Sequence, residues 1–171
     1  MLYLDTLCKD YTNGVIVETL DELRTFWLSC YRSNFRIIYR PTEKPQTIFP
    51  AVCDLVFLAK DMTFVVEECD TFFSGRETCD EFENVIRRGR KEGIELICVT
   101  QRPVGFGRML TSQIDDFYIF RAKEPPDLRY FRDRLGVEVA DQLPDLPRYH
   151  YLYTDDTTDK PVEVCKDDLI T

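Results

Sequence analysis

Short apolar runs alternate along the chain with longer segments in which apolar residues recur every three or four positions. A short apolar run is typical of a buried strand, and the longer spacing is typical of a helix that buries one face. The predicted strands lie at residues 2–5, 15–17, 35–39, 63–67, 96–100 and 117–120. Strands that alternate with helices favour an α/β fold with a mainly parallel sheet covered by helices.

Two sequence patterns predict where helices begin. Thr19, followed three residues later by Glu22, forms a capping box that opens a helix. Its apolar face holds Leu20, Leu23, Trp27, Cys30 and Tyr31. A second box, Thr78 with Glu81, predicts a helix whose inward residues are Phe82, Val85 and Ile86.

The rest of the chain completes the predicted fold. Residues 47–59 have a helical pattern, and a further helix is predicted to begin at Pro125 or Pro126 and to end at Gly136. Beyond Pro147, the alternating runs YHYLYT and PVEVC flank the polar segment DDTTDK, which predicts a C-terminal β-hairpin. No repeat or linker interrupts residues 1–171, so the sequence predicts a single α/β domain.

Composition narrows the class of protein. Hydrophobic residues make up 44% of the 171 residues and charged residues 31%, which is ordinary for a globular protein and argues against disorder. No apolar run approaches the roughly 20 residues of a membrane span, and no signal peptide is recognisable, so we expect a cytoplasmic protein. The net charge of −9 works against general attraction to nucleic acid, so DNA contact requires a local basic patch.

Cysteine and histidine usage gives little support to a metal site. The seven cysteines form no CxxC motif, are odd in number and lie mostly within apolar segments, which predicts reduced core thiols. They are Cys8, Cys30, Cys53, Cys69, Cys79, Cys98 and Cys165. His150 lies between two tyrosines, and we expect it to have a structural role.

A basic cluster follows the second capped helix, before Gly93 can stop that helix. Cations in a last helical turn complement the helix dipole, which is the plain interpretation. Contact with phosphate or DNA is the alternative. The cluster comprises Arg87, Arg88, Arg90 and Lys91.

The stretch FVVEE at residues 64–68 ends a predicted strand on two carboxylates. Ligands of parallel α/β sheets bind beyond the carboxyl ends of the strands. The strand LICVT ends there too, and Gln101 follows it. The sequence therefore predicts two acids and an amide at one edge of the sheet.

These two strand ends resemble the Walker B and sensor strands of P-loop NTPases of the additional-strand, catalytic-glutamate (ASCE) type. The next elements in order are the basic helix, the apolar strand, the turn TQRP at residues 100–103, and the segment 112–121 ending in arginine. That order resembles the FtsK/HerA superfamily of DNA-pumping ATPases, which includes phage and conjugative members. The similarity spans about residues 60–136 and is weaker upstream, in LYLDT and FRIIYRP. It implies a three-layer RecA/ASCE-like fold that uses ATP and Mg²⁺.

The resemblance also implies residue roles. Glu67 would hold Mg²⁺ through water, and Glu68 would polarise the water that attacks the γ-phosphate. The family usually has aspartate where this chain has Glu67, and the longer side chain weakens the match to strict octahedral geometry. Gln101 would sense the γ-phosphate, with Thr100 beside it.

Arg102 and Arg121 are candidates for contact with the phosphates or with a neighbouring subunit, because guanidinium groups stabilise transferring phosphoryl groups. A surface ion pair is the plain alternative for each.

The phosphate-binding Walker A loop, GxxxxGK[ST], is not present in these 171 residues. In the family this loop precedes the segment that resembles LYLDT. The sequence is therefore a fragment lacking the P-loop strand and helix, or another element fills the gap, or the strands close up in a rearranged sheet. We expect the first, and in all three cases we expect poor ATP hydrolysis by the chain alone, because positioning of the phosphates supplies most of the catalysis.

Three functions are compatible with these features. The first is the ATPase-like core of an FtsK/HerA-type DNA translocase or packaging motor, assembled as a homo-oligomeric ring around DNA. The second is a non-catalytic nucleotide-binding or scaffolding module derived from the same fold. The third, with least support, is a metal-dependent nuclease or phosphotransfer cluster, whose residues would be Glu67, Glu68, Asp70, Asp115 and Asp116.

Overall fold

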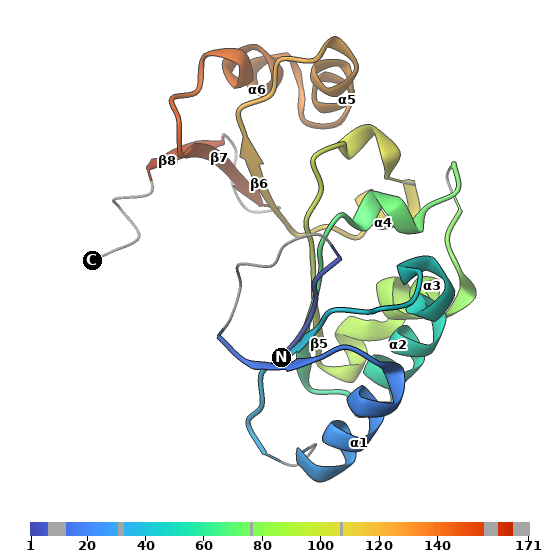
Figure 1. Cartoon of the computed structure of the whole chain (residues 1–171). Coiled ribbons are helices and arrows are strands. Elements are labelled where there is room, and N and C mark those ends of the chain that lie inside the picture. Colours follow the sequence, from blue (N-terminus) through green and yellow to red (C-terminus); the bar gives the residue numbers. More distant parts are fainter. Residues whose placement is uncertain (7–12, 31–32, 76, 107, 156–160, 166–171) are drawn as a thin grey trace. The chain divides into compact units, whose positions relative to one another are not determined.

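A computed structural model describes residues 1–6, 13–30, 33–75, 77–106, 108–155 and 161–165 (Figure 1). Backbone contacts divide the chain into two compact units, and the single domain expected from the sequence stays a prediction. Unit 1 comprises Met1–Gln101 and Gly105–Thr111, and unit 2 comprises Arg102–Val104 and Ser112–Thr171.

The elements follow the predicted alternation. In chain order they are β1 (Leu2–Leu4), β2 (Val15–Val17), α1 (Leu20–Cys30), β3 (Ile37–Tyr39), α2 (Pro45–Ala59), β4 (Met62–Val66), the 3-10 turn η1 (Cys69–Phe72), α3 (Asp80–Arg88), η2 (Gly89–Glu92), β5 (Ile94–Cys98), η3 (Pro103–Gly105), α4 (Arg108–Thr111), β6 (Asp116–Phe120), α5 (Pro125–Leu135), α6 (Val137–Gln142), η4 (Leu143–Asp145), β7 (His150–Asp155) and β8 (Val162–Cys165). None of the helices in the described part of the chain has the length and apolar character that a bilayer crossing requires.

Unit 1 is built on a parallel sheet of five strands in the order β2-β3-β1-β4-β5. The parallel sheet predicted from the apolar runs is therefore confirmed, with strand ends shifted by a few residues. Strand β4 is interior, because it pairs with β1 on one side and with β5 on the other. Their registers align Leu4 with Val66 and Val66 with Cys98, so the three strands end at the same edge.

The two predicted capping boxes have different outcomes. At α1, the amide of Glu22 donates to Thr19 Oγ1 and the amide of Thr19 donates to Glu22 Oε2, each at 3.2 Å, which confirms the first box. The second box is wrong. Cys79 precedes α3 as its N-cap, and the Thr78 hydroxyl donates instead to the carbonyl of Phe72 at 2.8 Å.

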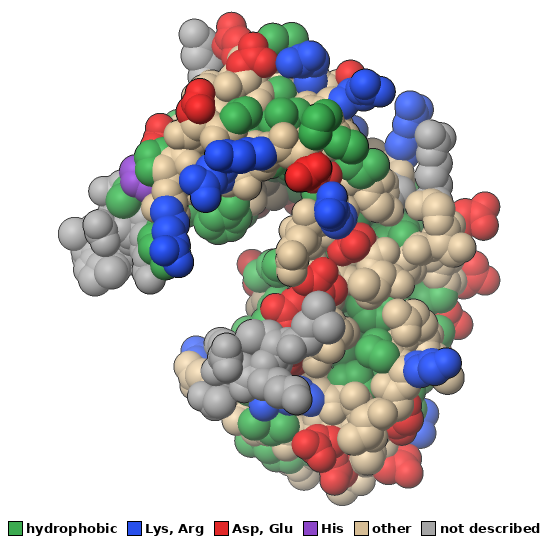
Figure 2. Space-filling view, turned by 45° about the horizontal axis from the view of Figure 1, so that its top comes forward, with side chains coloured by type: hydrophobic (Ala, Val, Ile, Leu, Met, Phe, Trp, Pro, Cys, Tyr) green, Lys and Arg blue, Asp and Glu red, His purple; other side chains and the backbone are tan. Residues whose placement is uncertain are grey.

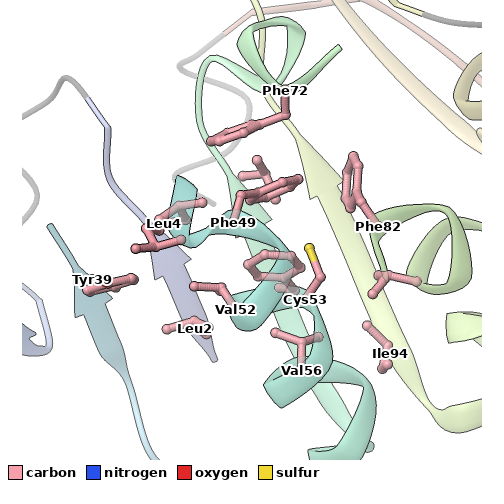
Figure 3. Close-up of a cluster of buried hydrophobic side chains, with 14 of the residues drawn as sticks. Leu2, Leu4, Tyr39, Phe49, Val52, Cys53, Val56, Phe72, Phe82 and Ile94 are labelled. Atoms are coloured by element: carbon pink, nitrogen blue, oxygen red, sulfur yellow. The ribbon is translucent and has the colours of Figure 1, made fainter. Parts of the chain in front are cut away.

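The core of unit 1 contains residues of the sheet and of helices α1, α2 and α3. Figure 3 shows the part of this core that surrounds α2. Phe49 of α2 is its centre: the ring stacks on Phe72 at 3.7 Å between centroids and meets Phe82 of α3 edge-on at 4.8 Å. Phe49 and Phe82 are almost completely buried. Such aromatic contacts add to the stabilisation that comes from buried apolar area. Through Phe72 they hold turn η1, which directly follows the two glutamates, against α2.

Of the described cysteines, Cys53 and Cys69 are buried and the others are half-buried, so the prediction of core thiols fits these two best. Burial, together with a hydrogen bond to Cys79, raises the pKa of Cys53. The same hydrogen bond lowers the pKa of Cys79 to about 7, because it stabilises the thiolate of the less buried partner. Cys8 lies outside the described residues.

Unit 2 is an antiparallel sheet in the order β6-β7-β8. Residues 117–120 were predicted to join the mainly parallel sheet, and this is corrected: β6 pairs antiparallel with β7. The predicted C-terminal hairpin is confirmed, since β7 and β8 are antiparallel neighbours. Alternation of apolar residues identifies a strand but does not fix its direction, so only the pairing partner decided the orientation of β6.

Helices α5 and α6 cover one face of this sheet. Helix α5 begins at Pro125 as predicted and ends before Gly136, whose φ of 96° is tolerated best by glycine. Helix α6 was not predicted, because Gly136 reads as a stop signal. The shared core contains Ile119, Phe131, Val139, Ala140, Leu143, Leu146 and Leu152.

Candidate functional site

The polar ends of β4 and β5 are held together by the backbone. The amide of Val99 donates to the carbonyl of Val66, and the amide of Cys69 donates to the carbonyl of Val99, both at 2.9 Å. These bonds continue the β4–β5 ladder past the last strand residues. The side chains that follow each strand are therefore carried to one place at the carboxyl edge of the sheet.

Glu68 and Gln101 are in direct contact at this edge. The Gln101 side-chain amide donates to Glu68 Oε1 at 2.6 Å. Glu68 adopts a left-handed conformation, with φ 48° and ψ 45°, which is uncommon for a residue other than glycine and is concentrated at turns and functional sites. The structure thus brings together the acid and the amide that the strand ends were expected to deliver.

A second contact lies beside the first. The Thr100 hydroxyl donates to Asp70 Oδ1 at 2.6 Å. A Cβ atom added to Gly105 would lie 3.0 Å from the Asp70 Cβ, so the backbone approaches this carboxylate closely where only glycine fits without adjustment. The turn after β4 and the turn after β5 are therefore joined by two side-chain hydrogen bonds in addition to the backbone bonds.

The backbone of Glu67 is bonded to β1 and to the residue shortly after it. Its amide donates to the carbonyl of Leu4 at 3.3 Å, and its carbonyl accepts from the Thr6 hydroxyl at 3.4 Å. The residue is half-buried. The two adjacent glutamates therefore have different environments, one backed by β1 and the other bonded to the end of β5.

An ion pair that sequence reasoning missed lies at the same edge. Asp5 follows β1, has a fully buried side chain, and accepts from Arg40 Nε at 2.7 Å; Arg40 follows β3. The other carboxylate oxygen, Oδ1, is buried with no hydrogen-bond partner. The signal was available, because both residues are charged and directly end apolar strands, as the two glutamates do.

The two predicted phosphate-contacting arginines belong to unit 2. Arg102 has an electrostatic effect on Asp127: burial raises the pKa of this carboxyl, and the guanidinium partly offsets the rise. Arg121 follows β6 and is exposed. Their assignment to the phosphates stays a prediction.

The predicted basic cluster at Arg87, Arg88, Arg90 and Lys91 lies at the end of α3 and in η2, directly before β5. It is therefore at the amino end of β5, the opposite edge of the sheet from the contact between Glu68 and Gln101. Arg87 forms an ion pair with Glu83 at 2.6 Å, and the Arg88 guanidinium lies 5.3 Å from the ring centroid of Phe57. Two of its four members thus have protein partners, and contact of the cluster with phosphate or DNA stays a prediction.

The acids of the proposed nuclease cluster do not form a metal site in the described residues. Asp115 and Asp116 belong to unit 2, whereas Glu67, Glu68 and Asp70 belong to unit 1. No group of three or more histidine, cysteine, aspartate or glutamate side chains in the described chain is arranged to hold a metal ion. The structure gives this third hypothesis no support.

Sequence comparison finds relatives among archaeal helicases. The chain is 35% identical over 88 residues to the DNA double-strand break repair helicase HerA of Saccharolobus solfataricus, covering 48% of this chain and 18% of that protein. It is 38% identical over 65 residues to the protein of the same name from Sulfolobus acidocaldarius, covering 36% and 13%. The chain therefore spans less than a fifth of either relative. No protein-family model matches the sequence.

Structure comparison finds viral packaging enzymes. The genome packaging NTPase B204 of Sulfolobus turreted icosahedral virus 2, in complex with AMPPCP, matches with a TM-score of 0.76 and 17% identity, covering 95% of this chain and 80% of that one. The DNA-packaging ATPase B204 of Sulfolobus turreted icosahedral virus matches with a TM-score of 0.75 and 19% identity, covering 95% and 80%. At this identity the match demonstrates a shared fold.

Proposed function

Because the chain is FtsK/HerA-like in sequence and in fold, we propose that it is the ATPase-like core of a DNA-translocating or packaging motor. The observation that carries this proposal is the 2.6 Å contact between Glu68 and Gln101 at the carboxyl edge of a parallel sheet. A carboxylate and an amide that touch can reach the same water molecule, which is what orienting a nucleophile beside a γ-phosphate requires.

In this proposal the two glutamates divide the work. Glu68 accepts a proton from the attacking water, and Gln101 reports on the phosphate by exchanging its bond to Glu68 for one to the water or the γ-phosphate. Mg²⁺, when bound, neutralises charge that develops on the phosphates. Glu67 and the unpartnered Asp5 Oδ1 fit this ion through bridging waters, since Mg²⁺ keeps several waters and uses only one or two carboxylates.

The phosphates need cations and amide groups that the described edge of unit 1 does not supply. Arg40 is held by Asp5, and the 171 residues contain no GxxxxGK[ST] loop. We therefore propose that efficient hydrolysis requires a phosphate-binding loop from outside these residues. By analogy with proteins named for DNA repair and genome packaging, we further propose a cytoplasmic, ring-shaped homo-oligomer with DNA as its substrate.

A non-catalytic scaffolding module remains the second candidate. Two features favour the scaffolding module: Arg40 is already paired with Asp5, and the 171 residues contain no GxxxxGK[ST] loop. Both weaken the affinity for a triphosphate.

Isothermal titration with Mg·ATP separates the two candidates. We expect micromolar binding by the chain, weakened at least about tenfold by EDTA, since the ion links carboxylate to phosphate. Glu68→Gln keeps the shape of the side chain, so binding persists while any turnover is lost. Glu77→Gln, at an exposed glutamate away from the site, changes neither. If titration with Mg·ATP gives no binding heat, the result would favour the scaffolding module. If ATP turnover survives Glu68→Gln, that residue does not have the catalytic role.

A further inference from the structure

One face of the sheet in unit 2 is lined by aromatic side chains. Tyr118 pairs with Tyr153 and Phe120 with Tyr151 across the β6–β7 ladder, so all four side chains project from the same face. The alternate residues, such as Ile119 and Leu152, belong to the core with α5 and α6. We call Tyr118, Phe120, Tyr151 and Tyr153 the aromatic face.

The rings of the aromatic face hold one another in place. The Tyr151 ring lies 5.6 Å from that of Tyr118 and 5.5 Å from that of Phe120, with interplanar angles of 49° and 50°. Tyr151 is only 8% exposed, whereas Tyr118 and Phe120 are 59% and 60% exposed. The rings of Tyr118 and Phe120 therefore pack against the buried ring of Tyr151 and remain open to solvent. Exposed aromatic rings that lie side by side are typical of an interaction surface.

Cations lie close in the chain to one end of these strands. Arg121 directly follows β6 and Arg148 shortly precedes β7, and antiparallel pairing places the end of β6 beside the start of β7. The Arg148 guanidinium lies 4.7 Å from the ring centroid of Tyr149, and Lys123 is nearby in the chain. All three cations are exposed, and the described residues offer them no ion pair. Figure 2 shows Lys and Arg side chains next to hydrophobic ones close to the histidine.

The opposite end of the face is acidic. The Tyr153 hydroxyl donates to Asp116 Oδ1 at 2.6 Å and to Asp155 Oδ2 at 3.0 Å, and these bonds raise the pKa of the tyrosine. Two carboxylates at this end repel an anion. A negatively charged ligand is thus favoured at the other end of the face, where Phe120 pairs with Tyr151.

We propose that the aromatic face binds single-stranded nucleic acid, with unpaired bases stacked on Tyr118 and Phe120 and phosphates beside Arg121, Arg148 and Lys123. Aromatic rings stack on any base, and unpaired cations attract the backbone that links the bases. A duplex fits poorly, because its bases already stack on one another. The aromatic face belongs to unit 2, and binding there does not require nucleotide at the carboxyl edge of unit 1.

The test is fluorescence anisotropy of a labelled oligothymidylate of about ten nucleotides, without ATP, at low salt. We expect Tyr118→Ala and Phe120→Ala each to weaken binding by about 5- to 150-fold, the range for loss of one base–ring stacking contact. Phe120→Tyr keeps a ring and retains affinity. Val137→Ala, at an exposed apolar residue of α6, is the control. Both aromatic positions are exposed, so circular dichroism should show folded variants.

The cations are tested by the dependence of affinity on salt. Arg121→Gln and Arg148→Gln should each weaken binding and lower the slope of log affinity against log salt, whereas Arg129→Gln on α5 leaves both unchanged. Undetectable binding by the unaltered chain, equal affinity for duplex, or full affinity in Phe120→Ala would overturn the proposal. Self-association of the chain that disappears in Phe120→Ala, without oligonucleotide binding, would identify a second copy as the occupant and likewise overturn it.

Discussion

The Asp5 carboxylate has no exposed side-chain surface, whereas its partner Arg40 keeps 20% of its own. A buried charge is tolerated only when a partner of opposite charge compensates it. The Asp5 carboxylate therefore depends on Arg40, and both lie at the edge of the sheet that we assign to nucleotide binding. Arg40 is fixed by its backbone as well, since its amide donates to the carbonyl of Val17. At the residue scale, the candidate site is thus preorganised around a buried ion pair as well as the contact between Glu68 and Gln101.

Removal of the cation should destabilise unit 1. We expect Arg40→Met to lower the free energy of unfolding by about 2–4 kcal/mol, because it leaves the Asp5 charge buried and uncompensated. The exposed pair of Arg24 with Asp21 provides the control, and Arg24→Met should cost less than about 1 kcal/mol. Urea unfolding measures both. If Arg40→Met lowers the free energy of unfolding no more than Arg24→Met does, the pair of Asp5 and Arg40 contributes less to stability than its burial implies.

Among the elements, the turn from η2 into β5 fixes where β5 begins. Gly93 has a φ of 72°, and its carbonyl accepts from the amide of Met62, the first residue of β4. A Cβ atom at Gly93 would clash with Asp61. This turn needs glycine for two reasons, the left-handed backbone and the close approach of a neighbouring segment.

These two reasons can be separated by comparing glycines. Gly75 also has a positive φ, 66°, but a Cβ atom there would meet nothing within 4 Å. We expect Gly75→Ala to cost about 1 kcal/mol from the backbone alone, and Gly93→Ala to cost at least about 2 kcal/mol because the clash adds to it. Thermal or urea unfolding gives the difference. Equal costs would show that the segment around Asp61 moves aside without penalty.

At the scale of the whole molecule, two hydrophobic clusters share no members. Phe82 belongs to the cluster of unit 1 and Leu152 to that of unit 2, and neither side chain is exposed. A unit that has its own hydrophobic core can unfold without unfolding of the other unit.

Native-state hydrogen exchange tests this independence. Leu152→Ala, which should cost about 2–5 kcal/mol, is expected to speed exchange of amides in β6 and β7 and to leave those in β1 and β4 unchanged. Phe82→Ala should have the reverse pattern. Uniform acceleration across both sheets by either substitution would instead establish one cooperative domain, as the sequence first suggested.

Local sequence patterns identified most of the strands and helices, with α6 as an exception, and the type of edge at which the candidate site forms. Apolar runs identify buried strands because burial acts on each residue locally, and acids at the end of the run FVV lie beyond the strand whatever its neighbours are. The capping box at Thr19 is local for the same reason. Three features became visible only in the folded chain: the antiparallel direction of β6, the alternative bond of Thr78 and the pairing of Asp5 with Arg40. These three features depend on which distant segment of the chain packs opposite. The residue pattern of one segment does not specify the segment that it pairs with.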